Sequence, residues 1–477
     1  MKENIKNSLD PEDWAVFRAQ GHRMLDDMLD YVEHIRQRPV WQPIPPAVRT
    51  SINEPFPINP GHLVEAYNTF IDKVLPYAVG NVHPGFMGWV HGSGTPVGML
   101  ADMLAAGLNA NLGGRDQMPV EVEYQIVRWM RELFSFPETA SGIFVTGSSM
   151  ANLMGLLVAR RAVLGPKVRK EGLRGPDLVA YTSVAAHGCV ARAMDLSGLG
   201  TSALRLIPTN DRHEMDITKL QAAISADRAA GLQPFFIMGT AGTVDVGAID
   251  DLMALADIAR REMLWFHVDG AYGALGILAP DIACRLKGIE CADSLAFDFH
   301  KWGQVPYDAG FLLVRDSIQH LDAFAAPAAY LRREARGLAG GSPWPCDFGP
   351  DLSRRFRALA TWFTFKVHGG AKLGRAMSEM CRLARYLAER IETYPDLELL
   401  APVSLNIVCF RFRCDDSDQV NTEIVADLQE LGIAAPSTTT VNGRLAIRAA
   451  IFNHRTRSQD LDALLAGVIS LGTGRLE

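Results

Sequence analysis

The sequence predicts an α/β fold whose large domain is built on a mostly parallel β-sheet, covered by helices on both faces. Two observations support this prediction. From about residue 95 to 315, short apolar runs alternate with segments of helical periodicity, as in buried parallel strands joined by helices. Turns rich in glycine and small polar residues follow several runs, at the strand ends where parallel sheets bind ligands.

Composition and charge exclude several classes of protein. The 477 residues allow two or three domains, and a formal net charge of -7 argues against a nucleic-acid partner. No apolar run reaches the roughly 20 residues that span a bilayer, and the N-terminus has no apolar signal core. The seven cysteines are scattered without a CxxC pair. We therefore expect a cytoplasmic protein with no metal site, no disulfides and no membrane partner.

Residues 1–95 are expected to form an N-terminal helical and extended segment. Asp10 and Pro11 have the properties of an N-cap and a first helical residue. Apolar residues then recur at spacings of three and four from Trp14 to Ile35, which predicts one long helix with an apolar stripe. This stripe needs a partner, either a neighbouring subunit or the body of the chain. The proline-rich residues 38–60 predict an extended linker.

Residues 96–350 are the predicted large domain, and residues 351–477 are a predicted small α+β domain. In the large domain, apolar runs predict strands at 143–146, 178–182, 204–207, 235–239, 264–268, 294–299 and 311–314. Helical periodicity predicts helices at 101–112, 120–134 and 249–261. In the small domain, we expect helices at 352–367, 373–394, 420–431 and 459–471, and strands at 405–412 and 444–449.

Two strand ends bring reactive side chains to the predicted ligand-binding edge. Residues 293–302 (DSLAFDFHKW) place His300 and Lys301 at the carboxyl end of one strand, although alone this pair is more simply a surface feature. Residues 267–273 (HVDGAYG) bring Asp269 to another strand end with little water. A buried carboxylate needs a cationic or donor partner, and a protonated pyridine nitrogen would serve. The simpler alternative is a turn or helix-cap aspartate.

Two further segments are informative only in combination with these. Residues 146–152 (TGSSMAN) run from a strand through a small-residue turn into a helix, and the free N–H groups there predict a phosphate site. The turn at residues 239–243 is similar and adds a hydroxyl. His187 is flanked by small residues after another strand, where its imidazole either stacks on an aromatic ring or is an ordinary structural histidine.

In chain order, the phosphate turn, the histidine, the aspartate and the lysine resemble the group II decarboxylases that depend on pyridoxal 5'-phosphate (PLP), of the aromatic-L-amino-acid decarboxylase type. The resemblance extends from the first helix to about residue 370, and includes His83–Pro84 and residues 99–104 and 354–357. It implies the aspartate-aminotransferase-like fold of PLP enzymes (fold type I), PLP as the cofactor, an amino-acid substrate, and a homodimer with active sites at the subunit interface.

The resemblance also implies three catalytic residues. By it, Lys301 forms the internal aldimine, Asp269 pairs with the pyridine nitrogen, and His187 stacks on the cofactor ring. Further cofactor contacts are implied for Ser148, Ser149, Asn152, Thr243, Ala271 and His300. The implied activity is decarboxylation of an L-amino acid, with an aromatic one favoured, to the amine and CO2. A non-catalytic binding protein of the same fold is the alternative, and the joint presence of the three catalytic residues weighs against it.

The first departure from the family leaves the reaction outcome open. Family members have a tyrosine, thought to return a proton to the substrate, on a mobile loop that corresponds to residues 340–349, and this stretch contains no tyrosine here. Tyr330 stands earlier in the chain, and His187 or a water is the fallback proton donor. Loss of the tyrosine also allows an aldehyde synthase, which couples decarboxylation to oxidative deamination, and a carbon–carbon lyase acting on another amine is a further alternative with the same cofactor.

The second departure concerns the substrate wall. The candidates for this wall are Trp89, His91, Arg115 and Tyr307. Arg115 stands where an aromatic residue is usual, and either binds an acidic substrate or forms an ion pair with Asp116 or Glu121. Decarboxylation of an acidic or polar amino acid is therefore a further alternative.

Overall fold

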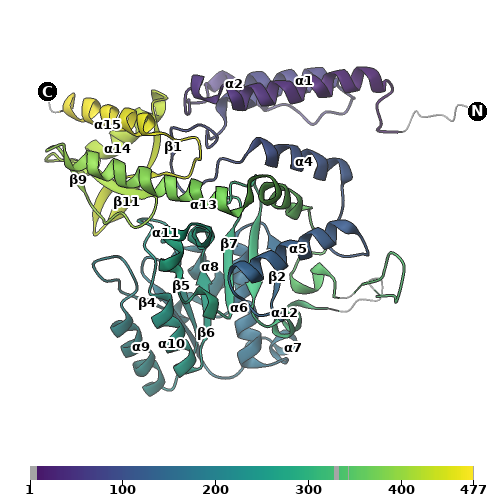
Figure 1. Ribbon diagram of the computed structural model, residues 1–477, viewed down its shortest axis with the longest axis vertical. Helices are drawn as coiled ribbons and strands as arrows, with labels where there is room; N and C mark the ends of the chain where they lie inside the picture. The colour runs from purple at the N-terminus through teal and green to yellow at the C-terminus, as the bar shows by residue number, and fades with distance from the viewer. Residues whose placement is uncertain (1–7, 327–331, 342, 476–477) are drawn as a thin grey trace, which may run out of the picture.

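The computed structural model describes residues 8–326, 332–341 and 343–475. Its large domain (Figure 1) contains a seven-stranded sheet with the order β2-β8-β7-β6-β5-β3-β4. Strand β8 is antiparallel to both of its neighbours and the other pairs are parallel, which confirms the mostly parallel sheet. The seven predicted strands are all present, as β2 (Ser141–Val145), β3 (Leu178–Ser183), β4 (Leu204–Ile207), β5 (Gln233–Thr240), β6 (Trp265–Asp269), β7 (Ser294–Asp298) and β8 (Gly310–Val314).

Helices cover both faces of this sheet. His267 on β6 lies against Gly155 of α6, whereas Gly239 on β5, the register partner of Val268, lies against Leu255 of α10. Because successive side chains of a strand point to opposite faces, α6 and α10 cover opposite faces. The helices of this domain are α4 (Pro96–Leu108), α5 (Met118–Leu133), α6 (Ser148–Leu164), α7 (Val168–Glu171), α8 (Cys189–Leu196), α9 (Ile217–Ala229), α10 (Leu252–Glu262), α11 (Pro280–Ala283) and α12 (Ser317–Phe324).

The C-terminal region forms a second sheet of five strands, in the order β1-β11-β12-β10-β9. Its strands are β1 (Phe86–Met87), β9 (Leu397–Leu399), β10 (Ile407–Phe412), β11 (Ala435–Val441) and β12 (Arg444–Ala450). The predicted strands β10 and β12 are present, whereas β1, β9 and β11 were not predicted. Strand β1 comes from the N-terminal segment and pairs with β11 in parallel, so that segment completes the small sheet. The domain boundaries at residues 95 and 350 stay predictions.

The helices of the small domain are α13 (Arg357–Glu392), α14 (Ser417–Glu430) and α15 (Ser458–Thr473). The two helices predicted at 352–367 and 373–394 are both present within the segment α13, on either side of Gly369, whose φ of 70° and ψ of 154° are not helical, and the first of them begins five residues late. Residues 352–356 are not helical because Arg354 is tied to the loop after α4, with its N–H donating to Asn111 Oδ1 at 2.9 Å. Helix α13 packs on both α4 and β10 and so connects the two sheets.

The N-terminal helix α1 (Trp14–Glu33) lies with α2 (Pro46–Ile52) at one edge of the molecule, away from the large sheet (Figure 1). The predicted N-cap Asp10 and first helical residue Pro11 are wrong, because Asp13 caps the helix by accepting the N–H groups of Ala15 and Val16. Helix α2 also interrupts the predicted extended linker. No residue of α1 is fully buried, and Trp14 and Phe17 at the start of its apolar stripe are exposed, whereas Met24, Met28 and Tyr31 are half-buried against this chain. Among the described helices, none is long and apolar enough to cross a membrane.

Candidate active site

A cavity of about 420 Å³ opens at the carboxyl ends of β5, β6 and β7. It lies where parallel sheets bind their ligands, as the sequence predicts. Eleven of the predicted site residues line it: Trp89, His91, Ser148, Ser149, Asn152, His187, Asp269, Ala271, His300, Lys301 and Tyr307. The structure thereby brings together residues that are more than 200 positions apart in the chain. Thr243 and Arg115 are the predicted site residues outside this lining.

Asp269 and Lys301 reach the cavity from neighbouring strands. Asp269 is the last residue of β6, and Lys301 follows the end of β7, which pairs with β6 in parallel. The Asp269 carboxylate is buried and accepts the N–H of Ala271 at 3.1 Å. Burial raises the pKa of Asp269, and the cation of Lys301 opposes this shift. A protonated ring nitrogen is the kind of partner that such a buried carboxylate needs.

Lys301 is held by a carboxylate that the sequence analysis did not assign to the site. Its Nζ lies 2.8 Å from Oδ2 of Asp298, which is 2% exposed. Burial alone would lower the pKa of Lys301, but the attraction and hydrogen bond of Asp298, together with the charge of Asp269, leave that pKa raised. The signal that identifies Asp298 is its place as the last residue of β7, equivalent to Asp269 on β6.

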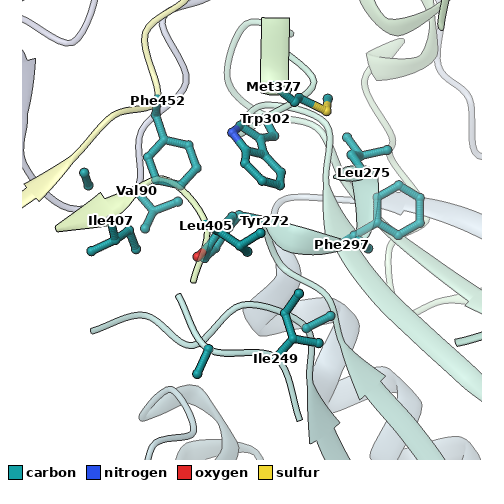
Figure 2. Close-up of a cluster of buried hydrophobic side chains, with 14 of the residues drawn as sticks. Val90, Ile249, Tyr272, Leu275, Phe297, Trp302, Met377, Leu405, Ile407 and Phe452 are labelled. Atoms are coloured by element: carbon teal, nitrogen blue, oxygen red, sulfur yellow. The ribbon is translucent and has the colours of Figure 1, made fainter. Parts of the chain in front are cut away.

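Trp302 fixes the backbone next to Lys301. Its indole is fully buried, and Figure 2 shows it beside Tyr272 and Phe452, with ring centroids 5.4 Å and 6.1 Å away. Phe452 follows β12 of the small domain, so this cluster joins the two domains, and Tyr272 connects it to the cavity lining. Because the cluster is close-packed, Trp302 cannot shift without opening the core, and Lys301 keeps its position.

The phosphate turn predicted at residues 146–152 leads into α6. Helix α6 begins at Ser148 after Gly147, which has no side chain with which to cap it. The Ser148 hydroxyl is buried and has no hydrogen-bond partner among the described residues, while Ser149 is exposed to the cavity. A helix N-terminus with free hydroxyls favours a bound phosphate.

Asn152 lines the cavity but its amide is already engaged. Its Oδ1 lies 2.9 Å from Nε2 of His267, and its Nδ2 donates to Sγ of Cys189 at 3.4 Å. The other ring nitrogen of His267 lies 2.6 Å from Oγ of Ser294. Burial lowers the pKa of His267 to about 3, so this imidazole is neutral. In this arrangement Asn152 supports the site from beneath.

Thr243 lies behind the cavity and shapes the turn after β5. Its hydroxyl oxygen accepts the N–H of Ala248 at 2.9 Å, and its side chain is fully buried. Thr240 lines the cavity in its place, with a buried hydroxyl that has no partner in the described part of the chain. The sequence contains the signal for Thr240, because it ends β5 and is the register partner of Asp269.

Two histidines, His187 and His300, complete the region around Lys301, and Ala271 lines the same cavity. His187 is exposed toward the cavity, and its Nδ1 accepts the N–H of Cys189 at 3.1 Å. His300 is buried, and its Nδ1 accepts the N–H of Ala309 at 3.0 Å. Burial lowers the pKa of His300, which makes it a neutral hydrogen-bonding group near the phosphate turn.

Aromatic rings form the outer wall of the cavity. The ring of His91 is stacked on Trp89, with centroids 6.0 Å apart, and on Phe86, at 5.7 Å. Tyr307 approaches His91 edge-on at 5.9 Å and lies 4.3 Å from the ring of His300. Nδ1 of His91 is buried without a hydrogen-bond partner among the described residues. The wall therefore combines stacking surfaces with one unused polar atom.

Arg115 is not part of this wall. It lines a separate cavity of about 500 Å³, and its guanidinium lies 4.5 Å from the ring centroid of Trp344. Neither Asp116 nor Glu121 forms an ion pair with it in the described structure. Trp344 is 2% exposed, and its indole N–H donates to the carbonyl of Gly340 at 2.9 Å. Tyr330 lies outside the described residues.

These residues fit PLP. The hydroxyls of Ser148 and Thr240 are buried and have no partner among the described residues, and they match the phosphate of PLP. The buried carboxylate of Asp269 matches the ring nitrogen, and the amine of Lys301 matches the aldehyde. A mostly parallel sheet with this site at its carboxyl edge, followed by a small α+β domain, defines a PLP-dependent enzyme of fold type I.

The comparisons identify the family. Residues 45–413 match the pyridoxal-dependent decarboxylase conserved domain, and the chain belongs to this family. An aromatic-L-amino-acid decarboxylase of Bacillus atrophaeus is 31% identical, over 99% of this chain and 97% of its own. A phenylacetaldehyde synthase of Arabidopsis thaliana is 28% identical over 94% of each chain. The crystal structure of Oryza sativa TDC with PLP and tryptamine superposes with a TM-score of 0.91, at 24% identity over 98% of this chain and all of that one.

These findings confirm the group II decarboxylase resemblance, fold type I and the PLP cofactor. The chain is a PLP-dependent amino-acid decarboxylase, a carboxy-lyase. The similar proteins include both an aromatic decarboxylase and an aldehyde synthase, so the family alone leaves the substrate and the final product open.

Proposed function

We propose that this enzyme decarboxylates an aromatic L-amino acid to the amine and CO2. The observation that supports this most directly is the wall formed by Trp89, His91 and Tyr307, which offers ring faces and edges to a side chain. Lys301 is the single lysine or arginine among the residues that line the cavity. An acidic substrate side chain therefore finds no guanidinium among the described residues of this lining, which favours the aromatic substrate over the acidic one.

The proposed roles of the chain follow from where its groups lie. When bound, PLP supplies an aldehyde that joins the substrate amine and a ring that accepts the electron pair left by CO2. We assign the ring nitrogen to the buried carboxylate of Asp269, the phosphate to the turn at Ser148 and Ser149, and one ring face to His187. Lys301 is the residue that holds the cofactor between turnovers.

Oxidative production of an aldehyde is the second candidate. The described residues 332–341 and 343–350 contain no tyrosine, and an aldehyde synthase is among the similar proteins. If the electron pair left by CO2 is not quenched by a proton, dioxygen takes it up and is reduced to hydrogen peroxide, and water releases the oxidised product as aldehyde and ammonia. The same cofactor site serves both reactions, so product analysis decides between them.

The test is an incubation of the PLP-loaded enzyme with the common amino acids, in which CO2, amine, aldehyde and peroxide are measured together. We expect CO2 and amine from an aromatic amino acid. CO2 with aldehyde and peroxide would replace the first proposal by the second. Turnover of glutamate or aspartate in preference to every aromatic amino acid would contradict the role of the aromatic wall.

Two matched variants examine the substrate wall. His91→Phe keeps a ring in the stack and removes the unused nitrogen, so we expect the preference to move toward substrates with an apolar ring. Arg115→Ala removes a guanidinium that lies in a separate cavity, and it is expected to leave the substrate preference unchanged. A gain of activity on aromatic over acidic substrates in Arg115→Ala would show that Arg115 reaches the substrate.

We also propose a cytoplasmic homodimer. The exposed apolar residues Trp14 and Phe17 on α1 support a second subunit that covers this helix. The seven cysteines are free, as suits a reducing compartment. Light scattering is expected to give twice the chain mass, and Trp14→Glu with Phe17→Glu is expected to lower it. A monomeric native protein would contradict the dimer.

A further inference from the structure

Helix α6 is capped by a residue that lies 150 positions away in the sequence. Gly147 precedes the helix and has no side-chain acceptor, but Oδ1 of Asp298 accepts the N–H of Ser148 at 2.7 Å. Asp298 ends β7 and is 2% exposed. Its carboxylate is thus fixed on one side by the phosphate turn and cannot rotate away from it.

The second oxygen of the same carboxylate holds Lys301. Oδ2 lies 2.8 Å from Nζ of Lys301 and 3.6 Å from Nε2 of His300. Burial lowers the pKa of His300, so its imidazole is neutral and does not balance the charge of Asp298. The ammonium of Lys301 is therefore the cation that compensates the Asp298 carboxylate. A buried carboxylate without a cation is costly, so the pair resists loss of the Lys301 proton.

We propose that Asp298 is a positioning residue that keeps Lys301, once it is released from the cofactor, as the ammonium that returns a proton to the substrate's α-carbon. This inference rests on the proposed role of Lys301 and deepens it. In the step, a C–H bond forms at the α-carbon, the N–H bond of the ammonium breaks, and Lys301 is left as a neutral amine. A neutral amine is the form that can rejoin the cofactor and release the product amine.

Tyr307 and the loop at residues 340–349 are weaker candidates for the proton donor than Lys301. Tyr307 lines the cavity, but burial and the nearby charge of Asp298 raise its pKa, which makes its phenol a weaker acid. In the loop, Trp344 is packed into the body of this chain. Among the described residues, the charged or titratable groups that line the cavity with Lys301 are His91, His187, Cys189, Asp269, Tyr272, Asp298, His300 and Tyr307. Of these, Asp298 forms the direct ion pair.

The first experiment measures Lys301 itself, without turnover. The full-length chain, freed of its cofactor, is mixed with pyridoxal at several pH values, and the carbon–nitrogen double bond is followed by its visible absorbance. The reaction needs neutral Lys301, so its rate rises as pH passes the pKa of the lysine. Asp298→Asn still accepts the Ser148 N–H but has no charge, so we expect its profile to move to lower pH and its rate near neutrality to rise about tenfold or more.

Asp293→Asn is the matched control. Asp293 precedes the other end of β7, and its carboxylate accepts the N–H of Phe266 at 2.8 Å, outside the cavity lining. The same charge is removed next to the same strand, and the pH profile is expected to stay in place. If Lys301→Ala reacted with pyridoxal as the native chain does, the proposed function of Lys301 would be wrong. If Lys301→Ala were inert but Asp298→Asn kept the native profile, only the role of Asp298 would be wrong.

The second experiment follows the product of the PLP-loaded enzyme. With dioxygen present as the oxidant, we expect Asp298→Asn to form aldehyde and peroxide in place of part of the amine, and this fraction to increase with pH as Lys301 loses its proton. Tyr307→Phe is expected to slow turnover without changing the product. Aldehyde from Tyr307→Phe together with pure amine from Asp298→Asn would overturn the proposal. If Asp298→Asn did not fold, the native enzyme provides the test. At pH values above the one at which its reaction with pyridoxal levels off, the fraction of aldehyde in its product must increase.

Discussion

Arg354 and Glu123 form an ion pair that is almost completely buried, with Nη2 2.5 Å from Oε1 and exposures of 1% and 2%. The same guanidinium donates to the carbonyls of Leu112 at 2.9 Å and Phe144 at 3.0 Å. Arg354 thus joins α5, the strand β2 and the segment that leads into α13. The motif at residues 354–357, which forms part of the family resemblance, has a structural function at this position.

Arg354→Met is expected to destabilise the protein by about 3 to 5 kcal/mol, because it leaves the Glu123 carboxylate buried without its cation. Urea unfolding measures the change. The neighbouring Arg355→Ala is the control, since Arg355 is half exposed and its ion pair with Asp102 contributes about 1 kcal/mol or less. Equal losses from the two substitutions would contradict the importance of burial.

Asp269→Asn is expected to lower kcat by roughly 10²- to 10³-fold with little effect on the fold. The amide oxygen can still accept the Ala271 N–H, but the negative charge at the end of β6 is lost. The rate of CO2 release and the absorption of the bound cofactor are measured together. Asp251→Asn, at the N-cap of α10, removes a similar charge outside the cavity and serves as control. More than half of the native kcat in Asp269→Asn would refute the assignment.

Gly92→Ala is expected to disturb the site, because a Cβ at this position would overlap the backbone oxygens of His300 and Lys301. The backbone must move to relieve this overlap, at a cost of about 1 to 3 kcal/mol. We expect kcat to fall by roughly 10²-fold as Lys301 is displaced. Gly107→Ala on α4 has open space around the new methyl group and should be neutral or stabilising. Native kcat in Gly92→Ala would show that the contact is tolerated.

His320 is expected to make the protein sensitive to acid. It is fully buried beside Ser141, and burial lowers its pKa to about 3. Below the ordinary histidine pKa of 6.5, the unfolded chain binds a proton that the folded chain does not. Stability therefore falls as pH decreases from 6.5 toward 3, by up to about 1.4 kcal/mol per pH unit for this residue.

His320→Gln should make this decline shallower, and His22→Gln, at an exposed position of α1, should leave it unchanged. The free energy of unfolding in urea is measured at several pH values for the native protein and both variants. An identical pH dependence in His320→Gln and the native chain would show that His320 does not contribute to it.

The predicted strands of the large domain are all present, because most of them are buried apolar runs bounded by turn residues, and burial on both faces leaves a strong local pattern. Strand β4 is the exception, since it lies at the edge of the sheet and Leu206 is exposed. Helix ends were predicted less well. Asp10 was a reasonable N-cap by residue type, but Asp13 is the residue whose carboxylate accepts helical N–H groups. The break between the two helices predicted around residue 369 is confirmed, since Gly369 has a positive φ that ends the helical geometry there, but the first helix begins five residues later than predicted.

Within the candidate site, the comparison of Thr243 with Thr240 shows why motif spacing is not enough. Both threonines stand in the same short turn, yet Thr240 faces the cavity from the end of β5 and Thr243 accepts a hydrogen bond within the turn. Arg115 was placed at the substrate wall by its position in the chain, but it packs on Trp344 in another cavity. The direction of a side chain depends on the backbone of its turn, which the sequence pattern does not specify.

The sequence by itself determined the class of chemistry. A phosphate turn, a histidine, an aspartate and a lysine that each follow or end a strand are local features, and the parallel sheet brings strand ends to one edge whatever the loop lengths are. The tertiary structure decided which charges compensate one another. Asp298 lies between the N–H of Ser148 and the ammonium of Lys301 because β7 runs beside the start of α6. Such a contact depends on packing between segments 150 residues apart, and no local pattern encodes it.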